Sequence, residues 1–360
     1  MRTKVTLMDL GWNASFQTEF ELLSRPELVP ARVSSVSKGH LHVWSESGES
    51  IAKLAGKLLF AARCASDLPA VGDWVAIGSR DSELAIVHHV LQRRTKISRK
   101  TAGRCAEEQI IAANVDTVFV VAALNHEFNP RRIERYVAMV WDSGAQPVVL
   151  LNKADVCDDV YTRVAEAECS APGVPVQAIS AAEGLGFEDL SNHLGRGRTC
   201  AFIGSSGVGK STIINRLLGE HVQSTLPVRE HDDRGRHSTT SRQMFRVLAG
   251  GLVIDTPGMR ELQLWGAEAG LSSAFHDIDE LARQCRYRDC NHQSEPGCAV
   301  RGAVESGTLD DARLTNFLKL RSEQAFLERK VDIHAAQEAK ARARLLCKEV
   351  RKITKFKNRT

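Results

Sequence analysis

The 360-residue sequence contains no run of eighteen apolar residues and no apolar segment near its start of the kind found in secretion signals. It therefore predicts neither a membrane span nor a cleaved leader, and we expect a cytoplasmic protein. Aromatic residues make up only 6% of the chain, but 43% of residues are hydrophobic and 26% are charged. This balance excludes a disordered or collagen-like chain, and the length indicates two or three domains.

The nine cysteines do not have the spacing of a disulfide framework, because six are scattered and three lie between residues 285 and 298. Those three form the pattern Cys285-x4-Cys290-x-His292-x5-Cys298. Three thiolates and one imidazole complete a tetrahedral Zn²⁺ site and leave no position for water, so we expect one structural zinc ion. A redox-active thiol cluster is the alternative.

The net charge of +4 is unevenly distributed. Residues 329–360 contain eleven Lys/Arg and three Asp/Glu, a net of +8, which leaves −4 for residues 1–328. A basic tail on a mildly acidic body favours a polyanionic partner, with a solvated helix as the alternative.

The first hundred residues divide into two segments. Residues 1–28 show no clear period and predict a loosely held extension. Residues 29–100 alternate apolar and polar positions between glycine-containing turns, which predicts a small antiparallel β-barrel. We interpret Trp44, Phe60 and Trp74 as core residues, so the barrel lacks an obvious row of exposed aromatics. The segment closes with "RRTKISRK", which is either a solvated linker or an RNA-facing surface and contains Arg93, Arg94, Lys96, Arg99 and Lys100.

Residues 101–268 have the sequence pattern of an α/β domain, in which buried strands alternate with amphipathic helices that cover a parallel sheet. A helix should begin after Asn129, with Pro130 in its first turn, and end at Gly144. Residues 269–330 hold the cysteine cluster, and residues 331–360 form the basic helical tail. Strands are predicted at 116–124, 147–155, 174–180 and 199–204, with a hairpin-like pair within 244–256.

The stretch "IGSSGVGKST" has the spacing of a phosphate-binding loop, and a strand precedes it and a helix follows it. Glycines let successive backbone N–H groups converge on anionic oxygens, while the helix N-terminus and Lys210 add positive charge. Ser211 is positioned by the motif to ligate Mg²⁺. The predicted phosphate-binding residues are Gly204, Ser205, Ser206, Gly207, Val208, Gly209, Lys210, Ser211 and Thr212.

The base is predicted by "NKAD", formed by Asn152, Lys153, Ala154 and Asp155. The Asp155 carboxylate can accept both the ring N–H and the exocyclic amine of guanine, whereas adenine offers a lone pair and no amine there, which disfavours an ATPase. Taken alone, four residues could equally be a polar turn after a strand. "ISAA" supplies a second element, Ser180 and Ala181, whose backbone would contact the guanine oxygen.

The stretch "DTPG" completes the set: Asp255 would reach Mg²⁺, and the Gly258 N–H would bond the γ-phosphate. Ordinary GTPases have the phosphate loop first and the base motifs last, but here the base motifs come first. The domain is therefore predicted to be circularly permuted.

This order, with a barrel before it and a cysteine cluster after it, resembles the circularly permuted GTPases of the RsgA (YjeQ/EngC) family, which act in late assembly of the small ribosomal subunit. The resemblance runs from about "PARV" to "NFLKLRSEQ". It is carried by "VGDWV", "RRTKISRKTAG", "IERYV", "IGSSGVGKST", "GRHSTT", "DTPGMRELQLW" and "CRYRDCNHQSEPGCAV".

The resemblance implies an N-terminal OB-fold barrel, a central P-loop GTPase domain and a C-terminal zinc-binding and helical domain. It also implies GTP and GDP as ligands, the small ribosomal subunit and its rRNA as partners, and a monomer off the ribosome. The family places a histidine, here His237, in the role of the glutamine that many GTPases use to orient water. Thr239 would then meet Mg²⁺, with Ser238 and Thr240 as rivals.

Two functional interpretations follow. The first is a Mg²⁺-dependent GTPase that binds the small subunit, assists its maturation and leaves after hydrolysis. The alternative is a GTP-gated RNA-binding module with negligible turnover. In both, we expect contacts to RNA backbone and shape rather than to base sequence.

Overall fold

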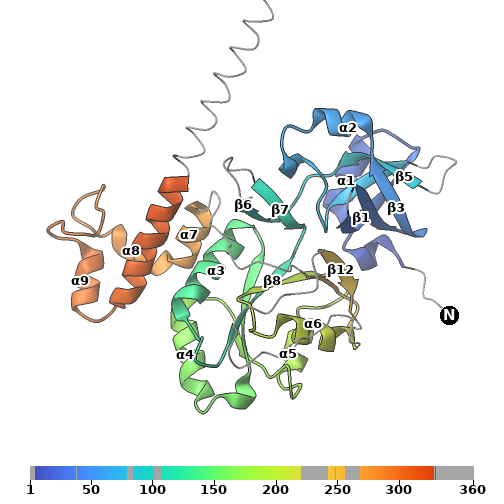
Figure 1. The fold of residues 1–360 in the computed structure, drawn as a ribbon. Coiled ribbons are helices and arrows are strands. Elements are labelled where there is room, and N and C mark those ends of the chain that lie inside the picture. The colour runs from blue at the N-terminus through green and yellow to red at the C-terminus, as the bar shows by residue number, and fades with distance from the viewer. Residues whose placement is uncertain are drawn as a thin grey trace, which may run out of the picture.

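The computed structural model describes residues 5–37, 39–78, 84–100, 108–219, 242–247, 249–255, 268–327 and 329. Figure 1 shows a barrel at the N-terminal, blue end of the chain, an α/β domain in green and yellow, and a helical C-terminal part in orange and red. In the part of the chain that the structure describes, every helix is too short or too polar to span a bilayer.

The barrel consists of β1 (Leu28–Ser37), β2 (His40–Ser45), β3 (Gly48–Leu54), β4 (Trp74–Gly78) and β5 (Leu84–Val90). The strands follow the order β1-β2-β3-β5-β4, and β4 pairs back with β1 to close the barrel. This is the OB-fold arrangement that the family resemblance implies. The expectation of a wholly antiparallel barrel is wrong at one pair, because β3 and β5 run parallel. Its interior is filled by small and β-branched residues such as Val33, Val43, Val75 and Val87.

The expectation of a loosely held N-terminal segment is wrong for residues 5–22. They form a 3-10 helix, η1 (Leu7–Leu10), and the helix α1 (Ala14–Leu22), and the side chains of Leu10 and Phe16 are buried. The Trp12 ring lies edge-on to the buried Trp74 ring of the barrel, 4.7 Å between centroids. Aromatic packing across this distance in sequence gives no periodic signal in either segment.

Arg32 fixes this N-terminal segment to the barrel and to the start of the next domain. Its buried guanidinium donates hydrogen bonds to the carbonyls of Leu10, Gly72 and Asn114. Burial lowers the pKa of Arg32 to about 10, which still leaves the group charged at neutral pH. One cation therefore joins three segments that are far apart in the chain.

Two interpretations of the barrel residues are corrected. Phe60 is not a core residue: it lies on the short helix α2 (Gly56–Ala61) and is 93% exposed. Arg93 is not available as an RNA contact, because its guanidinium pairs with the buried Asp73 and donates to the carbonyls of Ser66 and Leu68. The sequence between Arg93 and the α/β domain forms a separate hairpin of β6 (Lys96–Lys100) and β7 (Glu108–Ala113).

The α/β domain has the predicted parallel sheet. Its strands are β8 (Thr117–Ala123), β9 (Gln146–Asn152), β10 (Val176–Ala178), β11 (Thr199–Gly204), β12 (Gln243–Arg246) and β13 (Leu252–Asp255). They lie in the order β10-β9-β8-β11-β13-β12, and only β12 of these runs antiparallel to its neighbour in the domain. β12 also pairs with β1 of the barrel at Gln243 and Ser35, so the two sheets are continuous.

Alternate residues of the strands enter two cores, one on each face of the sheet. Val118 and Val120 of β8 pack in the cluster that includes the helices α3 (Pro130–Asp142) and α4 (Val160–Ser170). Phe119 and Val121 pack in the cluster with α5 (Phe187–Ser191) and α6 (Lys210–Leu218). Helix α3 begins as predicted, because the Asn129 side chain accepts from the N–H groups of residues 131 and 132 and Pro130 occupies the first turn.

The C-terminal part contains α7 (Glu268–Ala274), α8 (His276–Ala282), α9 (Ala299–Glu305) and a helix over residues 311–327. Helix α7 lies directly on α3, since a Cβ atom at Gly270 would sit 2.2 Å from the Ala138 carbonyl oxygen. The helical part is therefore packed on the face of the α/β domain opposite α5 and α6.

Candidate nucleotide site and zinc centre

The predicted nucleotide-binding motifs meet at one edge of the parallel sheet. "NKAD" begins at the last residue of β9, Ser180 lies just beyond β10, the phosphate loop begins at the last residue of β11, and Asp255 ends β13. Because parallel strands present their carboxyl ends at the same edge, segments far apart in the chain are brought together where α/β domains bind ligands.

The phosphate loop depends on two glycines that no other residue could replace without displacement. A Cβ atom at Gly204 would lie 2.3 Å from the Val121 carbonyl oxygen, and one at Gly209 would lie 2.2 Å from Nδ2 of Asn152. Both have positive φ angles, 149° and 96°. Lys210, the first residue of α6, donates from Nζ to the carbonyl oxygens of Gly204 and Ser205, so its charge lies inside the loop.

Asn152 connects the base motifs to the phosphate loop. Its side chain is buried, donates from Nδ2 to the Val208 carbonyl at 2.7 Å and accepts at Oδ1 from the Ala181 N–H at 2.9 Å. One amide side chain thus fixes the spacing between the segment predicted to recognise the base and the loop predicted to hold the phosphates.

Asp155 lies just beyond β9, in the 3-10 helix Ala154–Val156. The chain turns out of β9 at Lys153, which has a φ angle of 69°, and continues into a 3-10 helix that carries Ala154 and Asp155. The buried Ser180 hydroxyl donates to Oδ1 of Asp155 and accepts from the Glu183 N–H. Ser180 thereby orients an exposed carboxylate at the position the sequence predicts for guanine recognition.

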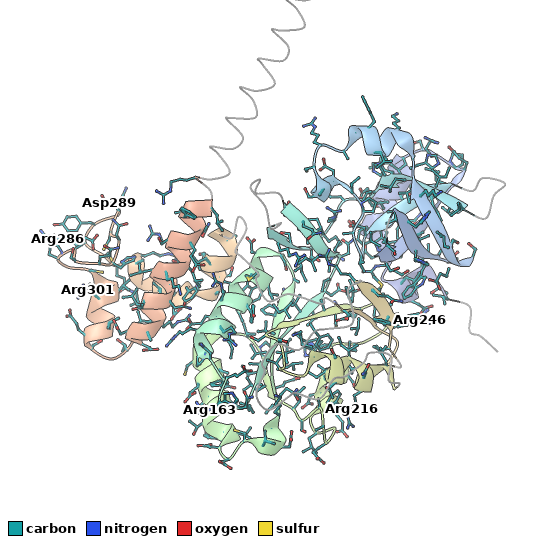
Figure 2. All side chains as sticks on the ribbon, in the orientation of Figure 1. Arg163, Arg216, Arg246, Arg286, Asp289 and Arg301 are labelled. Carbon is teal, nitrogen blue, oxygen red and sulfur yellow. The ribbon has the colours of Figure 1, made fainter. Side chains whose placement is uncertain are left out.

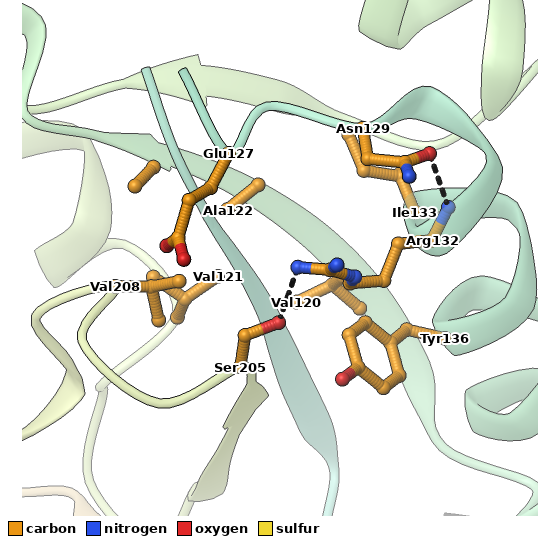
Figure 3. Close-up of a pocket in the computed structure, with 11 residues that line it drawn as sticks. Val120, Val121, Ala122, Glu127, Asn129, Arg132, Ile133, Tyr136, Ser205 and Val208 are labelled. Atoms are coloured by element: carbon orange, nitrogen blue, oxygen red, sulfur yellow. Dashed lines mark hydrogen bonds between the residues drawn. The ribbon is translucent and has the colours of Figure 1, made fainter. Parts of the chain in front are cut away.

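A contact that the sequence did not predict lies beside the phosphate loop. Arg132, in the first turn of α3, donates from Nη1 to the Ser205 hydroxyl at 2.8 Å. Figure 3 shows the two side chains facing one another across a small pocket whose lining also includes Glu127 and Tyr136. No local sequence pattern indicates this contact, because it depends on β8 and β11 being parallel neighbours in the sheet.

Of the residues predicted to hold Mg²⁺, Ser211 is the second residue of α6, and Asp255 ends β13, which is the parallel neighbour of β11. Hydroxyl and carboxylate oxygens suit a hard divalent cation. The predicted residues Gly258, His237 and Thr239, with the rivals Ser238 and Thr240, lie outside the described residues.

The four predicted zinc ligands gather at one point. The ligand atoms of Cys285, Cys290, His292 and Cys298 all lie within 4.8 Å of one another, and the cysteines are free thiols. Nδ1 of His292 is 3.5 Å from Sγ of Cys298 and 3.7 Å from Sγ of Cys285, and these two sulfurs are 3.9 Å apart. Around a tetrahedral zinc ion with ordinary bond lengths, a nitrogen and a sulfur ligand are roughly 3.5 Å apart and two sulfur ligands are roughly 3.8 Å apart. The observed distances therefore fit Zn²⁺.

Comparisons with known proteins agree with this geometry. The family model "RsgA GTPase" matches residues 90–265. The chain is 44% identical over 348 residues to the small ribosomal subunit biogenesis GTPase RsgA of Syntrophotalea carbinolica, covering 94% of this chain and 95% of that protein. It is 45% identical to the protein of the same name from Opitutus terrae, covering 91% and 92%. The chain belongs to the RsgA GTPase family.

Solved structures agree with the assignment to this GTPase family. The crystal structure of YjeQ from Thermotoga maritima matches with a TM-score of 0.62 at 27% identity, covering 82% of this chain and 98% of that one. The structure of YloQ, described as a circularly permuted GTPase, matches with a TM-score of 0.60 at 23% identity and supports the fold. The permuted order and the three-part architecture predicted from the sequence are thus confirmed.

Proposed function

We propose that this RsgA-family GTPase binds the small ribosomal subunit in its GTP form, assists late maturation of the subunit, hydrolyses GTP to GDP and phosphate, and leaves after hydrolysis. The observation that carries the proposal is the Asn152 side chain, which joins Ala181 of the base segment to Val208 of the phosphate loop. That contact supports one guanine-nucleotide site made from motifs about fifty residues apart in the chain. The relatives' printed name, small ribosomal subunit biogenesis GTPase, supports the partner.

The roles of individual residues at this site stay predictions. Asp155 recognises the guanine ring N–H and amine, Lys210 and the loop N–H groups bind phosphates, and Ser211 with Asp255 holds Mg²⁺. The bound Mg²⁺ would neutralise phosphate charge during hydrolysis. His237 would orient water, and Thr239 would close the Mg²⁺ site.

The zinc centre is proposed to be structural and to hold one Zn²⁺ per chain. The segment between its ligands presents Arg286, Tyr287 and Arg288, all exposed, on a knuckle that the metal would make rigid. Figure 2 shows Arg286 and Arg301 at the end of the C-terminal part farthest from the barrel. Exposed arginines on a rigid support suit phosphate contacts with rRNA.

The proposal also covers the domain boundaries, the oligomeric state and the location of the protein. We retain a division into residues 1–28, 29–100, 101–268, 269–330 and 331–360, a monomer off the ribosome and a cytoplasmic location, because each is compatible with a factor that works on an assembling subunit.

The proposal is tested by GTP hydrolysis with and without purified small ribosomal subunits, with ATP as the control nucleotide. We expect slow basal turnover, strong stimulation by subunits and no comparable stimulation of ATP turnover. His237→Ala should remove most of the stimulated rate while leaving GTP affinity nearly unchanged. Slow turnover that subunits do not alter, together with GTP-dependent subunit binding, would instead identify the GTP-gated binding module.

A further inference from the structure

Arg216 contacts the loop that follows β10 from the outside. It lies in the last turn of α6, and its guanidinium donates from Nε to the Ala181 carbonyl at 3.1 Å and from Nη2 to the Ala182 carbonyl at 2.7 Å. Figure 2 labels Arg216 beside α5 and α6. The helix that begins at the phosphate loop therefore also holds the loop that carries Ser180 and Ala181.

The surroundings of Arg216 are shaped to hold its guanidinium. The group lies over the Phe187 ring, 5.7 Å from its centroid. Gly184 faces it from the loop with a φ angle of 83°, and a Cβ atom there would be 2.2 Å from Nη1. The Gly184 N–H in turn donates to the Ser180 carbonyl at 2.7 Å, which closes the loop on itself.

The charge of Arg216 is directed at backbone carbonyls, since no carboxylate within the described ranges forms an ion pair with it. Hydrogen bonds from a charged donor are stronger than those between neutral groups. Ala181 is thus held on both sides: its N–H donates to Asn152 inside the site, and its carbonyl accepts from Arg216 at the surface.

We infer that Arg216 is a positioning residue for guanine recognition, which fixes the backbone of Ser180, Ala181 and Ala182 relative to the phosphate loop. The inference rests on the proposed function. In the proposed guanine site this loop would border the guanine O6, where adenine has an amine, so the position of its backbone would govern discrimination between the two bases. Asp155 would recognise the other edge, the ring N–H and the 2-amine, and the hydrogen bonds of Arg216 go to Ala181 and Ala182 and not to Asp155.

The test compares wild type with Arg216→Ala and Arg216→Gln, using affinities for GDP, IDP and ADP obtained by competition with a fluorescent GDP. Loss of two hydrogen bonds should weaken GDP binding about tenfold, mainly through faster dissociation. IDP keeps O6, so its binding should weaken by the same factor, whereas the binding of ADP should be nearly unaffected. The Gln variant, with one amide donor, should fall between Ala and wild type. The maximal rate at saturating GTP should not change.

Arg163→Ala is the matched control, because Arg163 pairs with Glu166 on the surface of α4 and makes no contact with the loop. Unchanged GDP affinity in Arg216→Ala would overturn the inference. So would an equal loss for GDP and ADP, which would place the damage in the phosphate loop. If the wild-type protein does not bind GDP more tightly than ADP, the result contradicts the proposed function as well as the role of Arg216.

Discussion

Arg313 and Glu134 form an ion pair between the C-terminal part and the α/β domain, with Nη1 3.1 Å from Oε1 and both side chains almost fully buried. Arg313 also pairs in a bidentate way with Asp277 and donates to the carbonyls of Ser170 and Ala274. Glu134 is one turn along α3 from Arg131, which also contacts it. Burial raises the pKa of Glu134, and a hydrogen bond from Asn316 and the charges of Arg131 and Arg313 oppose that rise.

Arg313→Met should destabilise the protein by about 3 kcal/mol, because it removes the buried cation that Glu134 and Asp277 share and leaves Glu134 paired with Arg131 alone. Denaturant unfolding measures the effect. Arg163→Met, which breaks a surface pair, should cost less than about 1 kcal/mol. Equal effects of the two substitutions would show that Arg313 does not stabilise the interface.

Zinc removal should unfold the segment around residues 285–298. We expect one Zn²⁺ per chain by elemental analysis, lost in Cys298→Ser and in His292→Ala, with increased protease cleavage in this segment. Cys169→Ser is the control, because Cys169 is exposed and lies outside the cluster. Full zinc content in both ligand variants would refute the assignment.

Asp155→Asn should weaken GTP binding at least about 100-fold, because an amide cannot accept both guanine donors. The same variant should gain affinity for XTP, whose 2-oxygen can accept from the new amide. Competition binding with GTP and XTP measures both changes. Asp158→Asn, at an exposed position three residues on, should bind like wild type. Retained GTP selectivity in Asp155→Asn would exclude this carboxylate from base recognition.

Asp142 predicts a pH-dependent stability change. Burial raises its pKa to about 6, partly opposed by Lys96, so the folded protein holds this proton more tightly than the unfolded chain. The ionised form therefore costs stability increasingly as pH rises from about 4 to about 6. Asp142→Asn should match wild type below about pH 3.8 and melt higher at pH 7 to 8. A constant difference in melting temperature across this range would contradict the raised pKa.

The sequence predicted what local pattern determines. The ends of α3 were predicted from Asn129, Pro130 and Gly144, because caps and turns depend on neighbouring residues. The zinc ligands were predicted because they lie within one short stretch. The packing of Trp12 on Trp74 was not predicted, since neither residue signals the other in sequence. Phe60 was assigned to the core because hydrophobicity alone does not tell an exposed aromatic from a buried one.

The contacts of Arg132 and Arg216 were missed for a related reason. Each arginine lies on an amphipathic helix, where a charged residue ordinarily faces solvent. Their partners Ser205, Ala181 and Ala182 belong to different segments, which only the order of strands in the sheet brings near.

The pairing of β12 with both β13 and β1 places three residues in one row across the protein. Asp255 is paired with Gln243, and Gln243 is paired with Ser35 of the barrel. Hydrogen-bonded strands keep a fixed spacing of about 4.8 Å, so a shift of the Asp255 strand displaces its neighbours. If the barrel is bound to a large partner, it would oppose such a shift. Binding of the barrel would consequently change the free energy needed to rearrange the residues at the end of β13.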